Sequence, residues 1–99
     1  MKYVVIVTRD PEAPAEAFTP ELLNTESDRS LTLLRDGVFR EIYSRDDGKG
    51  AVLVLEAATE AEARAALDSL PMAQAGLISF AVYGTRAYRG FLRGLPTAG

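Results

Sequence analysis

Hydrophobic and polar positions follow two different periods along this chain of 99 residues. Near its start, residues 3–7 (Tyr-Val-Val-Ile-Val) are apolar at consecutive positions, which is typical of a central strand covered on both faces. Residues 10–20 then contain three prolines, which the interior of a helix does not tolerate. We therefore predict a buried strand followed by a loop.

Leucines recur between charged residues over 21–36, which predicts a first helix. Its stretch 24–30 is rich in Asn, Thr, Ser and Asp, whose side chains compete for backbone hydrogen bonds, so we expect the helix to start late or bend there. A second helix is predicted to begin after Thr59, because Glu62 three positions later completes a capping box. Pro71 is expected to end this helix.

Three more strands complete the pattern. Residues 38–45 alternate between two faces, residues 51–57 form a more apolar run, and the Asp-Asp-Gly-Lys-Gly turn between them predicts a β-hairpin. After a loop at 71–76, residues 77–84 form the last predicted strand. The order is βαββαβ, which predicts a ferredoxin-like α+β fold: an antiparallel four-stranded sheet with two helices on one face.

Alternation in the strand 38–45 predicts which of its side chains lie together. It places Phe39 and Tyr43 on one face and Arg40 on the other. The pattern leaves open which of these faces meets the helices.

We expect one domain at 1–86 and a C-terminal arm at 87–99, docked at an interface or partly disordered. The arm begins with Tyr-Arg-Gly-Phe at 88–91, residue types that are enriched at protein interfaces. One face of the predicted sheet carries no helix, and so short a chain buries little of its apolar surface. The predicted partner is therefore a second copy of the chain, in a homodimer or a larger homo-oligomer.

Composition narrows the chemistry. Neither cysteine nor histidine occurs, which excludes disulfides, thiol nucleophiles and histidine ligands for metals, so we expect neither metal nor other cofactor. Proton transfer would then use carboxylates, tyrosines or lysines. The net charge of −3 argues against a nucleic-acid partner. The first apolar run is too short to span a membrane, and a cysteine-free chain suits the cytoplasm.

Two segments resemble the muconolactone isomerase-like family, which is related to YciI-like proteins: 34–40 (Leu-Arg-Asp-Gly-Val-Phe-Arg) and 67–72 (Leu-Asp-Ser-Leu-Pro-Met). The resemblance covers roughly 26–91 and implies a dimeric α/β barrel, in which two sheets face one another. It also implies a cofactor-free isomerase that moves a proton by means of an acidic residue on the first helix. Glu26 occupies that position, counted back from Gly37. The sequence departs from the family in having Arg29 near the position of a helix lysine and no histidine.

Glu26 is the candidate catalytic residue, because a half-buried carboxylate can move a proton next to a carbonyl. The alternative is an acid in the first turns of a helix that interacts with the helix dipole. Arg40 is a candidate clamp for a substrate carboxylate or, equally, a structural partner of an acid. Arg29, Tyr43 and Tyr83 are the other candidate substrate-binding residues, and packing is the competing role for the tyrosines.

The leading hypothesis is a small-molecule-binding barrel protein whose apolar pocket lies between the sheet and the first helix, lined by Glu26, Arg40 and Tyr43. Its substrate would be a small anionic or lactone metabolite. Two alternatives stay open: a non-catalytic oligomerising module and a cofactor-free monooxygenase.

Overall fold

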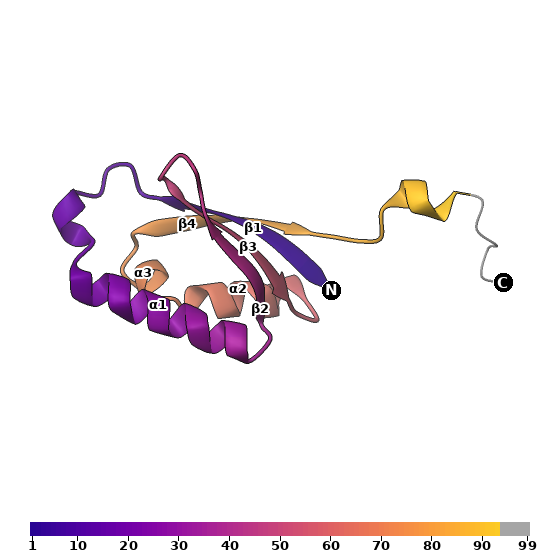
Figure 1. Ribbon diagram of the computed structural model, residues 1–99, viewed down its shortest axis with the longest axis horizontal. Helices are drawn as coiled ribbons and strands as arrows, with labels where there is room; N and C mark the ends of the chain where they lie inside the picture. The colour runs from indigo at the N-terminus through magenta and orange to yellow at the C-terminus, as the bar shows by residue number, and fades with distance from the viewer. Residues whose placement is uncertain (94–99) are drawn as a thin grey trace.

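The computed structural model describes residues 1–93 and consists of one antiparallel sheet covered by helices on one face (Figure 1). The strands lie in the order β2-β3-β1-β4 and comprise β1 (Lys2–Arg9), β2 (Phe39–Ser44), β3 (Gly50–Glu56) and β4 (Ile78–Gly84). The α-helices are α1 (Pro20–Arg35), α2 (Glu60–Asp68) and the short α3 (Pro71–Gln74). The predicted ferredoxin-like α+β fold is confirmed.

The core lies between the helices and the face of β1 that carries Tyr3, Val5 and Val7, all of them buried. The antiparallel register pairs Val5 with Leu53 of β3 and Val82 of β4, so this face of three strands is apolar. The other core residues come from the helices and the neighbouring strands: Leu33, Phe39, Leu53, Leu55, Ala63, Leu67 and Leu70. Burial of this side-chain layer is the main contribution to the stability of the fold.

Helix α1 is continuous, so the expectation of a late start or a bend at 24–30 is wrong. Thr19 caps it by accepting a 3.1 Å hydrogen bond from the backbone N–H of Leu22, and Pro20 fills the first helical position, where no intrahelical N–H bond is lost. Hydroxyls inside the helix donate to the carbonyl four residues earlier, which satisfies them without breaking the helix. These hydroxyls belong to Thr25, Ser27 and Thr32.

A β-bulge at Arg40 interrupts the predicted alternation in β2. Phe39 pairs with Leu55 and Glu41 pairs with Val54, so β2 contains one more residue than β3 between these two pairs. Phe39 is consequently buried against the helices while Tyr43 lies on the opposite face. The prediction that Phe39 and Tyr43 share a face is therefore wrong, because one extra residue reverses the parity of the strand.

Thr59 caps α2 as predicted, whereas the returning bond to Glu62 comes from the residue before the cap instead of from Thr59 itself. Thr59 accepts from the N–H of Glu62 at 3.2 Å, and the Glu62 carboxylate accepts from the N–H of Ala58 at 3.2 Å. The helix ends at Asp68, and Pro71 starts α3 where a loop was expected. Proline suits the first position of a helix because its φ is already helical.

The chain after β4 leaves the body of the domain (Figure 1). It carries a 3₁₀ turn, η2 (Arg89–Leu92), while a second such turn, η1 (Ala15–Ala17), lies in the loop after β1. Tyr88 and Phe91 pack edge to face at 4.8 Å between ring centroids, yet they are 68% and 79% exposed. The radius of gyration is 16.1 Å, against about 13 Å for a compact chain of this size. Docking of the arm 87–99 stays a prediction, and residues 94–99 lie outside the described part.

Candidate functional site

A cavity of about 160 Å³ lies between α1, α3 and the helix-covered face of the sheet; we call it the inner cavity. Its lining is mostly apolar and comes from six elements: Val7, Arg9, Glu26, Ser30, Ile42, Ser44, Gly50, Ala51, Met72 and Ile78. An apolar protein cavity of roughly 150 Å³ holds a molecule the size of benzene. The inner cavity therefore has the size and polarity for a small ring-shaped metabolite.

Glu26 is the acidic residue in this lining. Its side chain is half-buried, and Oε1 accepts a 2.9 Å hydrogen bond from the backbone N–H of Met72 in α3. Burial raises the pKa of Glu26, and the hydrogen bond from Met72 opposes part of that rise. Within residues 1–93, the other oxygen, Oε2, takes part in no hydrogen bond. One oxygen thus holds the side chain in place, and the lone pairs of the other are not used by any described residue.

The two arginines predicted from the sequence serve other contacts. Arg40, in the bulge, is exposed and donates from Nε to the carbonyl of Gly37 at 2.7 Å. Arg29 donates from Nε to the hydroxyl of Ser69 at 3.1 Å, which joins α1 to the end of α2. Neither side chain lines the inner cavity.

The two predicted tyrosines lie on the face of the sheet that the helices leave open. Tyr43 is 58% and Tyr83 59% exposed. The Tyr43 hydroxyl donates to Glu41 at 2.7 Å, and this bond raises the pKa of Tyr43. Of the five predicted site residues, the structure brings Glu26 alone to the inner cavity.

Arg9 lines the inner cavity but was missed by the sequence analysis. It is the last residue of β1, two positions after Val7 and four after Val5. This alternation could have shown from the sequence that Arg9 shares their face. Its guanidinium carbon lies 4.7 Å from the centroid of the Phe18 ring, a cation–π contact. This contact connects the end of β1 to the loop that leads into α1.

A second hollow, of about 470 Å³, lies beside Arg9 at the end of the sheet; we call it the outer groove. Its residues come from the end of β1, the following loop and the β2–β3 turn: Thr8, Arg9, Asp10, Pro11, Phe18, Gly48 and Lys49. The outer groove thus has two cationic side chains and one carboxylate.

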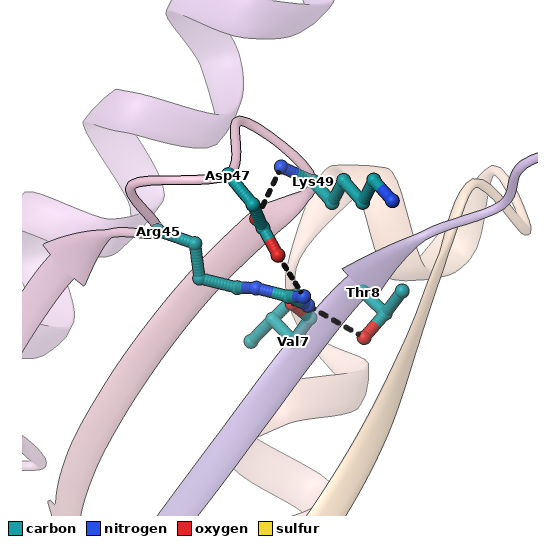
Figure 2. A network of polar contacts seen from close by, with 5 residues as sticks. All are labelled: Val7, Thr8, Arg45, Asp47 and Lys49. Carbon is teal, nitrogen blue, oxygen red and sulfur yellow. Dashed lines mark hydrogen bonds and ion pairs between the residues drawn. The ribbon is translucent and has the colours of Figure 1, made fainter.

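A polar network holds the β2–β3 turn against β1 beside this groove (Figure 2). Arg45 pairs with Asp47 and donates to the hydroxyl of Thr8 at 3.0 Å. Asp47 also accepts from the N–H of Lys49 at 2.9 Å, and these two interactions lower the pKa of Asp47. The hydrogen bond from Lys49 in this network uses its backbone N–H, and no ion pair within residues 1–93 includes its ammonium.

Within residues 1–93 there is no group of three or more acidic, histidine or cysteine residues that could hold a metal ion. In the same part of the chain, every helix is too short or too polar to cross a membrane.

No protein-family model matches the chain, and no curated protein sequence matches it. Solved structures do. A muconolactone isomerase crystal structure superposes with a TM-score of 0.70 at 20% identity, over 89% of this chain and 91% of that one. A 5-chloro-2-hydroxyhydroquinone dehydrochlorinase from Burkholderia phenoliruptrix AC1100, in complex with 2,5-dihydroxybenzoquinone, superposes with a TM-score of 0.59 at 16% identity, over 91% and 98%.

Both matches cover nearly the whole of each chain, so they concern the entire domain rather than one motif. At this level of identity they establish the fold and leave the reaction to be argued from the site. The predicted resemblance is confirmed: the chain has the fold of the muconolactone isomerase-like family.

Proposed function

We propose that the inner cavity binds a small, largely apolar metabolite with a lactone or carboxylate group, and that Glu26 moves a proton on it without a cofactor. The observation that carries this proposal is the anchored, half-buried carboxylate in a cavity of about 160 Å³. A glutamate with a raised pKa is a better base than an ordinary one, which suits proton removal at neutral pH.

The proposed reaction is the shift of a double bond. Glu26 Oε2 takes a proton from a carbon next to a carbonyl, and the electron pair of the broken C–H bond delocalises into the carbonyl as an enolate. The protonated Glu26 then returns the proton to the far carbon of the conjugated system, so that no atom is gained or lost. To carry the proton from one carbon to the other, the carboxylate needs an oxygen that no other group already occupies. Among residues 1–93, Oε2 makes no hydrogen bond.

The structural neighbours support this chemistry as a proposal. One is named as an isomerase of a lactone and the other as a dehydrochlorinase solved with a quinone, so both are enzymes that act on small ring compounds. The present chain shares their fold and has an inner cavity of about 160 Å³, while its substrate has to be found by experiment.

We further propose that a second copy of the chain covers the sheet face without helices, which we call the open face. Polar residues such as Lys2, Glu41 and Glu56 also lie on this face, but seven of its side chains are apolar or aromatic and either partly buried or exposed: Val4, Ile6, Val52, Val54, Ala81, Tyr43 and Tyr83. An apolar area of this extent on a small domain favours association. The aromatic pair of Tyr88 and Phe91 on the projecting arm gives a further contact to a neighbouring subunit.

The test of the enzyme proposal is the Glu26→Gln variant, assayed with a panel of unsaturated lactones with and without a carboxylate. The amide oxygen of glutamine can still accept from the N–H of Met72, so the fold is kept while the base is removed. We expect double-bond migration, followed by absorbance, to fall at least 100-fold. Equal turnover by both proteins would remove Glu26 from the mechanism.

The main alternative is a non-catalytic oligomerising module. The bond between Glu26 and Met72 favours it, because it satisfies a first-turn N–H of α3 and so gives Glu26 a purely structural role. In that case the wild-type chain would shift the double bond of no compound in the panel.

A further inference from the structure

Arg9 is the residue that the inner cavity and the outer groove have in common. Its backbone ends β1, opposite Ile78 of β4, and Arg9 lines both spaces. A molecule seated beside Glu26 and extending into the outer groove would therefore lie against Arg9.

The Arg9 guanidinium is held in position without being neutralised. Its central carbon lies 4.7 Å from the centroid of the Phe18 ring, a contact with an aromatic ring that uses none of the guanidinium N–H groups as donors to an oxygen. None of the ion pairs formed within residues 1–93 involves Arg9. A planar cation fixed in this way has the geometry that binds a carboxylate with two parallel hydrogen bonds.

Lys49 supplies a second positive charge beside it. The backbone N–H of Arg9 donates to the Lys49 carbonyl at 2.9 Å, so the two residues are neighbours across the end of the sheet. Asp47 in the same turn is already paired with Arg45, and the Lys49 side chain extends away from it (Figure 2). No ion pair between described residues includes Lys49.

The acid in the groove is engaged elsewhere. Asp10 Oδ1 accepts a 2.9 Å hydrogen bond from the N–H of Glu12, which shapes the loop after β1. Two cations against this one carboxylate leave the groove with a net positive charge on a chain whose total charge is −3. Such a local excess on an acidic protein attracts a small anion.

We propose that Arg9 and Lys49 form an anion subsite that binds the carboxylate of the substrate, while the apolar part of the same molecule lies in the inner cavity beside Glu26. This inference rests on the proposed function of the inner cavity and adds to it the two residues that hold the carboxylate of the substrate, which are specificity-determining and do not themselves transfer the proton.

The competing role of Arg9 is structural: its contact with Phe18 could serve only to hold the loop 10–18 on the sheet. The two roles predict different effects on the binding of charged and uncharged ligands. A structural Arg9 affects all ligands alike, whereas an anion subsite distinguishes an acid from its uncharged ester.

The test measures calorimetric binding of two matched probes, an unsaturated lactone bearing an acetate side chain and its methyl ester. We compare the full-length wild type with Arg9→Gln and Lys49→Gln, and use Arg35→Gln, an exposed arginine at the far end of α1, as the control. We expect Arg9→Gln to weaken binding of the acid at least about tenfold and Lys49→Gln severalfold, with the ester changed less than twofold. Arg35→Gln should change neither.

Lys49→Gln keeps the measurement decisive if Arg9→Gln fails to fold, because Lys49 is exposed and its side chain holds no structural contact with an acid. Equal losses for acid and ester, or no loss for either, would overturn the anion subsite. Failure of both probes to bind the wild type at millimolar concentration would overturn it as well. Selective loss of the acid together with full turnover by Glu26→Gln would keep the subsite and reject the proposed catalysis.

Discussion

Glu26 and Met72 lie 46 positions apart in the sequence, yet Oε1 of Glu26 accepts the backbone N–H of Met72 at 2.9 Å. The bond joins α1 to α3 at the wall of the inner cavity. It ties the orientation of the candidate base to the packing of the domain, so the same residue bears on stability and on chemistry.

Replacement of Glu26 should separate these two contributions. Glu26→Ala leaves the N–H of Met72 without a partner in a partly buried position, so we expect a loss of about 1 kcal/mol in the free energy of unfolding. Glu26→Gln keeps an acceptor and should lose less than half of that. Urea unfolding of both variants at pH 7 measures the difference, and equal stabilities would show that the bond to Met72 contributes nothing.

The pH dependence of stability should carry the signature of a raised pKa at Glu26. Its pKa is raised in the folded state above the ordinary value of 4.5, so between these two values the folded chain binds the proton and the unfolded chain does not. The wild type should therefore lose stability relative to Glu26→Gln as pH rises through that window, and then remain constant. A difference that does not change from pH 4 to pH 8 would contradict the raised pKa.

The rate of double-bond migration should increase as Glu26 loses its proton, whereas the stability of the fold decreases. Only the ionised carboxylate can accept a proton, so kcat/KM should rise with pH up to the raised pKa of Glu26 and then level off. A profile measured between pH 4 and pH 8 checks this, with substrate ionisation determined separately. An apparent pKa at or below 4.5 would exclude Glu26 as the group that titrates.

Gly50 should not tolerate a side chain. A Cβ there would lie 1.9 Å from the carbonyl oxygen of Val7, a backbone atom of the central strand that cannot move freely. We expect Gly50→Ala to destabilise the domain by more than about 2 kcal/mol. Gly48→Ala is the matched control in the same turn, because it shares the positive φ but has nothing within 4 Å of the new Cβ. Similar unfolding midpoints for both would contradict the close approach.

The open face should hold the oligomer together. Ile6 lies at its centre, paired with Val52 on one side and Ala81 on the other, so Ile6→Glu would place a charge in the proposed interface. We expect the wild type to be a dimer or larger by light scattering, and Ile6→Glu to be a monomer.

Leu31→Glu, at an exposed position of α1, is the control and should keep the mass of the wild type. Deletion of 88–99 tests the arm separately, and we expect it to reduce the mass or the stability of the oligomer. A wild-type chain that stays monomeric at millimolar concentration would refute the interface.

The sequence by itself determined the order of elements and therefore the fold, because the signals that define them are local. The period of apolar residues marks β1 and α1, and the Thr59 and Glu62 capping box marks the start of α2 within four residues. Glu26 could be identified from the sequence because the family resemblance lies in a nearby segment, from which its position on the first helix is counted.

Tertiary structure decided the composition of the site. The bulge at Arg40 arises from the register between β2 and β3, and it reversed the faces predicted for Phe39 and Tyr43. Arg9 and Glu26 line one cavity only because the sheet and α1 pack together. Such contacts join residues far apart in the chain, and a local pattern has no information about which distant side chains will meet across the core.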